Sequence, residues 1–148
     1  MPDSPLEVRL AQASELPRIN TAYTGLGYTG KVTPADTVFV AEREHEIVGL
    51  VRRTHEHGVT MLRGMYVVAQ AQRQGIGSDL LAHFVTHLNG QDCYCVPYTH
   101  LVGFYSSEGF QVLPPGQAPG FLAERLVQYR HDGGDVLLMW RPGAPRLL

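Results

Sequence analysis

A short glycine-containing segment is the part of this sequence best suited to bind an anion. It reads Gln72-Arg73-Gln74-Gly75-Ile76-Gly77-Ser78 and lies between a β-rich run and an amphipathic run. The first backbone N–H groups of a helix lack intrahelical partners and carry partial positive charge. Glycines let the backbone approach an anion closely, and the Arg73 guanidinium can add charge-assisted hydrogen bonds. The segment therefore predicts a phosphate-binding loop at the start of a helix.

Three other interpretations of this loop have to be weighed. The dinucleotide-binding pattern G-x-G-x-x-G needs a third glycine where this sequence has Leu80, and it normally opens its domain, whereas several strands are expected before this loop. The P-loop needs a glycine and a lysine followed by serine or threonine, and the segment has no such run. A plain glycine turn into a helix, binding nothing, is the third alternative.

The composition fits a folded protein without a strongly charged partner. The 148 residues are 44% hydrophobic and 18% charged, with a formal net charge of −2, so we predict a single domain over residues 1–148 and no nucleic-acid partner. Neither a bilayer-spanning run nor a signal-peptide pattern is seen, so a cytoplasmic protein without a membrane partner is expected. Cys93 and Cys95 lie on one face of a predicted strand and are expected to be buried thiols.

The order of predicted elements is α+β. Strands are predicted at 6–10, 37–41, 47–51, 59–68, 93–96, 110–113 and 135–141. Helices are predicted from Ser14 onward, with Ser14 as the N-cap, and then after the loop, at 101–108 and at 121–130. The helix after the loop is indicated by an apolar stripe from Leu80 to Leu88 and ends at Asn89-Gly90. The sequence thus predicts hairpins first and then a strand–helix–strand–helix unit.

Two histidine pairs have spacings that occur in zinc sites. His55 and His57 lie in a turn, and His83 and His87 are four residues apart on one helix. Neither pair has an obvious third ligand, and the H-E-x-x-H pattern does not occur. No metal is predicted, and the histidines are interpreted as exposed polar residues.

Two motifs, in order, resemble the GNAT superfamily of acyl-CoA-dependent N-acyltransferases. The loop Gln72–Gly77 satisfies the fixed positions of that family's Gln/Arg-x-x-Gly-x-Gly/Ala pyrophosphate signature. Met65–Val68 resembles the end of its central strand, and Phe104–Phe110 resembles its F-Y-x-x-x-G-F segment. The resemblance implies a mixed, mostly antiparallel central sheet of about six to seven strands flanked by helices.

The resemblance also implies that acetyl-coenzyme A is the cofactor. Main-chain N–H groups are implied to provide most of the contacts, with Val67 donating to the thioester carbonyl and so stabilising a developing oxyanion. The cofactor-binding residues implied in this way are Tyr66, Val67, Gln72, Arg73, Gln74, Gly75, Ile76, Gly77 and Ser78. The chain departs from the family's pattern at two positions. Tyr98 replaces a frequent asparagine that contacts the arm of the cofactor, and Ala69 replaces the usual proline after the central strand.

Tyr105 matches the family's general acid, which protonates the leaving thiolate. A tyrosine with a pKa of about 10 stays protonated at neutral pH, and packing against Phe110 is its alternative role. A general base is harder to identify, since deprotonating an alkylamine at pH 7 costs about 4–5 kcal/mol. The central-strand glutamate of many relatives is missing at Thr60–Gly64, so Glu42 is the candidate base, with a solvated turn charge as its alternative.

The predicted function is direct transfer of an acetyl group to a primary amine, with Tyr105 as general acid. The expected acceptor is a small metabolite or an amino-acid-like compound, bound between the loop Tyr23–Lys31 and the segment before the last strand. A protein N-terminus or lysine is the alternative acceptor, and a non-catalytic acyl-CoA-binding module is the alternative function. A homodimer through the C-terminal strand stays open.

Overall fold

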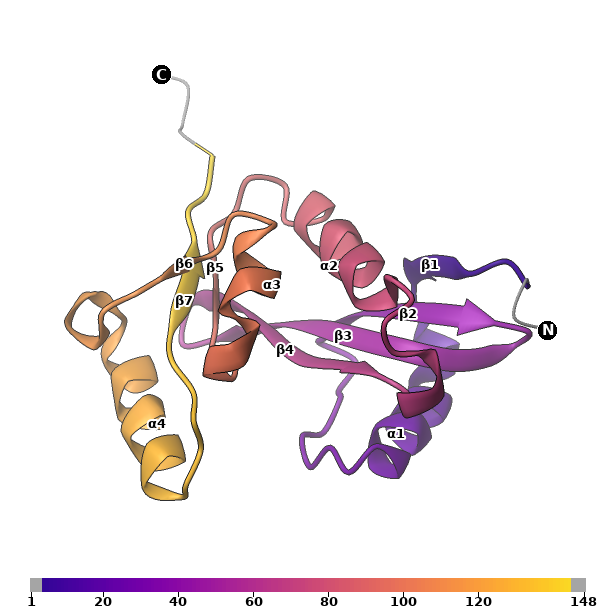
Figure 1. The fold of residues 1–148 in the computed structure, drawn as a ribbon, viewed down its shortest axis with the longest axis horizontal. Coiled ribbons are helices and arrows are strands. Elements are labelled where there is room, and N and C mark those ends of the chain that lie inside the picture. Colours follow the sequence, from indigo (N-terminus) through magenta and orange to yellow (C-terminus); the bar gives the residue numbers. More distant parts are fainter. Residues whose placement is uncertain (1–3, 145–148) are drawn as a thin grey trace. The chain divides into compact units, whose positions relative to one another are not determined.

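The computed structural model describes residues 4–144, and Figure 1 shows its elements in chain order. These are β1 (Glu7–Leu10), α1 (Leu16–Gly25), β2 (Thr37–Arg43), β3 (Glu46–Glu56), β4 (Val59–Val67), α2 (Ile76–Thr86), β5 (Cys93–Cys95), α3 (Val102–Ser106), β6 (Gln111–Val112), α4 (Gly120–His131) and β7 (Met139–Arg141). The seven strands follow the hydrogen-bonded order β1-β2-β3-β4-β5-β7-β6. The predicted α+β class with a mostly antiparallel sheet is confirmed.

The chain forms two compact units. The first comprises the residues up to Thr54 together with Leu62–His87, and the second comprises His55–Met61 together with the residues from Leu88 onward. Strands β3 and β4 contribute residues to both units. The single domain predicted over residues 1–148 stays a prediction.

In the first unit, alternating side chains of β2 pack against helices on opposite faces of the sheet. Val38 and Val40 are buried in one cluster with Ile19 and Tyr23 of α1. Phe39 points the other way and meets Phe84 of α2, with ring centroids 5.7 Å apart. Figure 1 shows α1 and α2 on opposite sides of β2 and β3. The period of two along β2 thus explains how one strand supports both helices.

The hairpin between β2 and β3 is irregular near its turn, and this affects the direction of the last side chains of β2. Glu44 and His45 both have positive φ, at 53° and 65°, as a tight two-residue turn requires. The pairing of β2 with β3 is antiparallel, and its register shifts between Ala41 and Glu42. Such an irregularity re-aims the side chains that follow it, and here these are Glu42 and Arg43.

Helix α1 begins two residues later than predicted. The proposed cap at Ser14 is wrong, because a single 3₁₀ turn over Ala13–Glu15 precedes the helix. Glu15 accepts a hydrogen bond from the backbone N–H of Gln12 at 2.9 Å, as in a capping box. The carboxylate thus binds the backbone N–H of Gln12, the N-cap residue of the 3₁₀ turn.

In the second unit, β7 pairs antiparallel with both β5 and β6, and β5 pairs in parallel with β4 through Met61 and Tyr94. One face carries a core cluster that includes Met61, Leu122, Leu126 and Leu138. The predicted last strand is shorter than expected: β7 begins at Met139, and Val136 forms only an isolated bridge to Tyr98.

Cys93 and Cys95 are both buried and free, which confirms the prediction of core thiols. Burial raises the pKa of the Cys95 thiol well above its usual range, so it stays protonated. Across residues 4–144, no helix has the length and apolar character needed to cross a membrane.

Candidate active site

The predicted phosphate-binding loop lies at the N-terminus of α2, in the first unit. Helix α2 begins at Ile76, and its N-cap is Gly75, which adopts a left-handed conformation with φ of 82°. No side chain makes a capping hydrogen bond there. The first N–H groups of the helix, those of Ile76, Gly77 and Ser78, therefore point outward without a side-chain acceptor, at the positive end of the helix dipole.

Gly75 combines two properties that suit the approach of an anion. Its positive φ is accessible to glycine at little cost, whereas an L-residue is strained there. A Cβ built on Gly75 would meet no atom within 4 Å, so the space in front of its backbone is open. Arg73 also has positive φ, at 66°, and is exposed. Two left-handed residues separated by Gln74 form the kind of turn in which successive N–H groups line an anion-binding nest.

Side chains hold the loop from within the first unit. Gln72 Nε2 donates to the Val67 carbonyl at 3.0 Å, which ties the loop to the end of β4. Gln74 Nε2 donates to the Gln70 carbonyl at 3.4 Å, and Gln74 Oε1 accepts from Arg43 Nη1 at 2.7 Å. The glutamines predicted to bind the cofactor thus also fix the loop that carries them.

The end of β4, with Tyr66 and Val67, precedes this loop directly. Gly64 interrupts the strand with a φ of 63°, and its carbonyl accepts a hydrogen bond from the Tyr23 hydroxyl at 2.8 Å. After the strand, the Val68 N–H donates to the Val48 carbonyl at 2.9 Å. The irregularity of β4 is thus located at Gly64, two residues before Tyr66, and a role of Tyr66 and Val67 in holding the thioester arm stays a prediction.

Three tyrosines form an aromatic cluster next to this irregularity. The ring of Tyr28 lies 4.6 Å from that of Tyr23 and 5.5 Å from that of Tyr66, measured between centroids. Tyr23 is only 1% exposed, so it belongs to the core rather than to an acceptor-binding surface. The buried Arg52 guanidinium lies 5.5 Å above Tyr28 and pairs with Asp36 at 3.1 Å.

Tyr105 lies on α3, in the second unit, and is 4% exposed. Its ring packs edge-on against Phe104 and Phe110, with centroid distances of 4.9 and 5.8 Å. Burial raises the pKa of its hydroxyl, and the nearby Cys95 adds to this shift. A hydroxyl with a raised pKa stays protonated at working pH, as a proton donor must be. The packing on Phe110 is present, and the role of Tyr105 as general acid stays a prediction.

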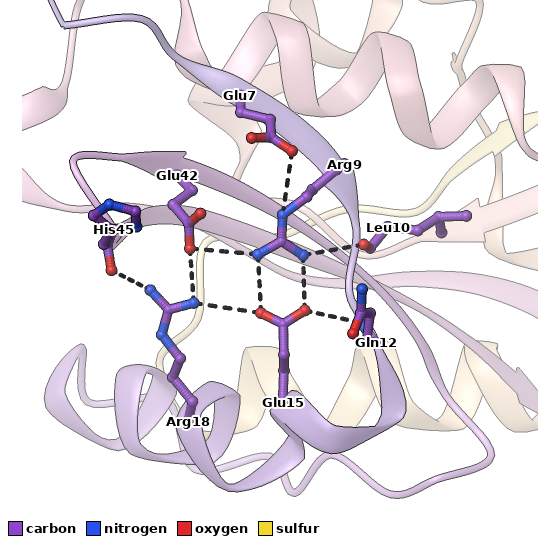
Figure 2. A network of polar contacts seen from close by, with 8 residues as sticks. All are labelled: Glu7, Arg9, Leu10, Gln12, Glu15, Arg18, Glu42 and His45. Atoms are coloured by element: carbon purple, nitrogen blue, oxygen red, sulfur yellow. Dashed lines mark hydrogen bonds and ion pairs between the residues drawn. The ribbon is translucent and has the colours of Figure 1, made fainter.

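Glu42 lies in a network of charged side chains around the start of α1, which Figure 2 shows from close by. Its Oε2 accepts from Arg18 Nη1 at 2.7 Å and from Arg9 Nη2 at 3.3 Å. Glu15 bonds the same two arginines, with Arg9 Nη1 at 2.7 Å as its shortest contact. The hydrogen bond from Arg18 is the main reason why the pKa of Glu42 is lowered. A carboxylate so stabilised in its charged form is a weak proton acceptor.

Sequence reasoning missed Arg43 and the contact between Tyr23 and Gly64. Both join residues that are far apart in the chain, by 31 positions for Arg43 and Gln74 and by 41 for Tyr23 and Gly64. Gly64 is the one local signal of the second contact, because a glycine within a strand often marks a bulge or the close approach of another part of the chain. Among the described residues, no cluster of three or more His, Cys, Asp or Glu is arranged to hold a metal.

The family model that matches this chain is described as an acetyltransferase (GNAT) domain, and it covers residues 34–112, more than half of the 148. The chain belongs to the GNAT acetyltransferase family. Membership confirms the resemblance found in the sequence, together with the predicted enzyme class, an acyl-CoA-dependent N-acyltransferase, and its cofactor, acetyl-coenzyme A. The matched residues include the loop Gln72–Ser78 and Tyr105. No curated protein sequence matches this GNAT chain significantly.

Solved structures of GNAT proteins share the fold at low sequence identity. The ribosomal-protein-S18-alanine N-acetyltransferase from Escherichia coli has a TM-score of 0.69 and 15% identity, with 97% of each chain covered. A GNAT-family acetyltransferase from Streptococcus pneumoniae has a TM-score of 0.69 and 14% identity, covering 95% of this chain and 100% of that one.

A third similar structure is N-acetylglutamate synthase from Neisseria gonorrhoeae, complexed with coenzyme A and N-acetyl-glutamate. Its TM-score is 0.68 at 17% identity, and the match covers 97% of this chain. The chain spans only 36% of the length of that synthase. At these identities the likeness shows a shared fold and nothing more.

Proposed function

We propose that this GNAT protein transfers the acetyl group of acetyl-coenzyme A to a primary amine of a small, amino-acid-like compound. The observation that carries the proposal is the N-terminus of α2, whose first N–H groups have no capping side chain and open onto free space at Gly75. A helix N-terminus whose backbone N–H groups have no capping side chain is suited to the paired phosphates of a nucleotide cofactor.

The residues present fit this cofactor. The diphosphate would be held by the N–H groups of Gly75–Ser78, with Arg73 free at the surface to add charge, and its thioester arm would lie along Tyr66 and Val67 at the end of β4. Gln72 and Gln74 would support the loop through the bonds described above. When bound, acetyl-coenzyme A supplies the activated acetyl group.

Tyr105 is the general acid in this proposal. Its raised pKa keeps the proton on the hydroxyl at neutral pH, and it also makes the hydroxyl a weaker acid than an exposed tyrosine. The aromatic packing against Phe104 and Phe110 fixes the ring, which restricts the directions in which the hydroxyl can point. A coenzyme thiolate with a pKa of about 8.5 needs only this one proton to leave as a thiol.

The charge network disfavours Glu42 as the general base, although its role stays a prediction. Since two arginines hold its charged form, Glu42 takes up a proton only at low pH. An acceptor with a weakly basic amine needs no strong general base, because its neutral form is reached at a lower free-energy cost. A peptide α-amino group, with a pKa of about 7.7–8.0, costs roughly 1 kcal/mol to deprotonate at pH 7, against about 4–5 kcal/mol for an alkylamine.

The same argument favours one second candidate, the N-terminal amine of a protein. The full-length likeness to the ribosomal-protein-S18-alanine N-acetyltransferase supports it, because the match covers 97% of both chains. A lysine side chain has the higher amine pKa and is disfavoured by the lack of a base.

A panel of amines offered with acetyl-coenzyme A tests the proposal. Release of free thiol should depend on the amine, and α-amino compounds should be acetylated faster than alkylamines of the same size. Acetylation of peptides with a free N-terminus but not of single amino acids would favour the second candidate. If coenzyme A binds with micromolar affinity and no amine is acetylated, the chain is a non-catalytic acyl-CoA-binding module and the proposed activity is wrong.

A further inference from the structure

We infer that Arg43 is a positioning residue for coenzyme A: it fixes the phosphate-binding loop through the side chain of Gln74. The inference rests on the proposed use of this loop for the cofactor's phosphates. It adds a residue from the β2–β3 hairpin, far from the loop in sequence, to the groups that determine cofactor affinity.

The contact is short and comes from a neighbouring element. Arg43 is the last residue of β2, and its Nη1 donates to Gln74 Oε1 at 2.7 Å. Gln74 in turn donates from Nε2 to the Gln70 carbonyl at 3.4 Å. The amide of Gln74 is therefore held on its oxygen by the sheet and on its nitrogen by the loop itself.

The position of Gln74 within the loop gives this contact its importance. Gln74 lies between Arg73 and Gly75, which both have positive φ, at 66° and 82°. The direction of the N–H groups in an anion nest depends on such successive conformations. An exposed loop of this kind would lose much of its order without an anchor, since fixing each residue costs conformational entropy. Anchoring Gln74 before the ligand arrives shifts that cost from binding to folding.

Arg43 also has unused hydrogen-bonding capacity. Its Nε is buried and has no acceptor among the described residues. Arg52 and Arg53 also have a buried Nε without a partner among the described residues, so this feature alone does not mark a ligand site. The guanidinium brings a second positive charge beside Arg73 to the loop, which suits phosphate oxygens as neighbours.

A comparison of two ligands separates positioning of the phosphate loop from a general structural role. Coenzyme A carries the phosphates, and pantetheine has the same thiol arm without them. Dissociation constants for both are measured by NMR titration of the full chain, wild type and variants, and the melting temperature of each variant is recorded. Arg43→Ala should weaken coenzyme A about five- to tenfold, the size of one lost hydrogen bond, and leave pantetheine within about twofold.

Variants of Gln74 test whether Arg43 acts through this residue. Gln74→Ala should weaken coenzyme A as much as Arg43→Ala does, and the double variant should be no weaker than either single one, because both changes remove the same contact. Arg43→Lys retains the charge and one donor and should recover part of the affinity.

Arg53 offers a matched control at the other end of the same helix. Its Nη1 donates to the His87 carbonyl at 2.7 Å, the same distance as in the Arg43 contact. Arg53→Ala should lower the melting temperature without changing the coenzyme A dissociation constant.

Three results would overturn the inference: unchanged coenzyme A affinity in Arg43→Ala, equal weakening of both ligands, or additive effects in the double variant. Each of these requires that the wild-type chain binds coenzyme A. A wild-type chain that binds no coenzyme A would contradict the proposed function itself, and with it the inference.

Discussion

The hydroxyl of Tyr23, on α1, donates a 2.8 Å hydrogen bond to the carbonyl of Gly64, in the middle of β4. Gly64 is left-handed, with a φ of 63°, so its carbonyl leaves the regular ladder of the sheet and needs another donor. A Cβ at Gly64 would lie 2.9 Å from the Tyr23 hydroxyl oxygen, so the pair fits only with glycine there. The helix and the strand thus fix each other at the point where β4 departs from regularity.

Tyr23→Phe should lower the free energy of unfolding by about 1–3 kcal/mol, because a buried carbonyl loses its donor. Urea denaturation measures the change. Tyr28→Phe is the matched control, since the Tyr28 hydroxyl is buried without a partner among the described residues. Removing that hydroxyl should be neutral or slightly stabilising. Equal losses in both variants would show that the Gly64 bond does not stabilise the fold.

Gly75→Ala should weaken coenzyme A binding about tenfold or more, equivalent to ~1.4 kcal/mol. Its Cβ would project into the open space in front of the loop, and its φ of 82° is strained for an L-residue. Gly58→Ala controls for strain alone, because Gly58 has a φ of 80° and equally open space in the β3–β4 turn. Calorimetric titration should find coenzyme A affinity unchanged in Gly58→Ala. The same loss in both variants would disconnect Gly75 from the phosphate site.

Tyr105→Phe should lower turnover at least about tenfold, the lower end of general-acid effects, with little change in the affinity for acetyl-coenzyme A. The ring contacts with Phe104 and Phe110 are retained, so the melting temperature should hardly change. Tyr94→Phe, on β5, serves as a control that removes another hydroxyl of the second unit. Unchanged turnover in Tyr105→Phe would assign this tyrosine to packing alone.

The charge network predicts how stability depends on pH. Hydrogen bonds from Arg9 and Gln12 lower the pKa of Glu15 from 4.5 to about 2. Between these values the unfolded chain binds more protons than the folded one, so stability is fully present above about pH 5 and falls as the pH decreases toward 2. The lowered pKa of Glu42 acts in the same direction.

Glu15→Gln should therefore flatten the decline of unfolding free energy between pH 5 and 2, and lower stability at pH 7 by about 1–3 kcal/mol. Urea denaturation at several pH values checks this. The exposed Glu124, on α4, provides a control, and Glu124→Gln should retain the wild-type slope. An unchanged slope in Glu15→Gln would mean that the network does not link protonation to folding.

Local patterns predicted the fold class and the helix that begins after Gly75. The β-rich run of β2 and the apolar stripe of α2 are properties of neighbouring residues, and the structure has Phe39 and Leu80 buried as those patterns require. The left-handed Gly75 also follows from a local rule, because glycine is favoured where positive φ is needed. Cys93 and Cys95 were expected in the core for the same kind of reason.

Contacts that depend on strand register were not predictable in this way. The shift between Ala41 and Glu42 determines how Glu42 meets Arg18 and how Arg43 meets Gln74. Nothing in the sequence near position 41 marks that shift. Glu42 was consequently considered as a base or a solvated charge, and its two arginine partners were not foreseen.

Titration of the ¹⁵N-labelled chain with coenzyme A, observed residue by residue, addresses the role of the α2 N-terminus. We predict saturable binding in which the amide signals of Gly75, Ile76, Gly77 and Ser78 shift most, because their N–H groups acquire phosphate acceptors. Saturable binding that leaves these four signals in place while others move would contradict the phosphate-binding role of the loop.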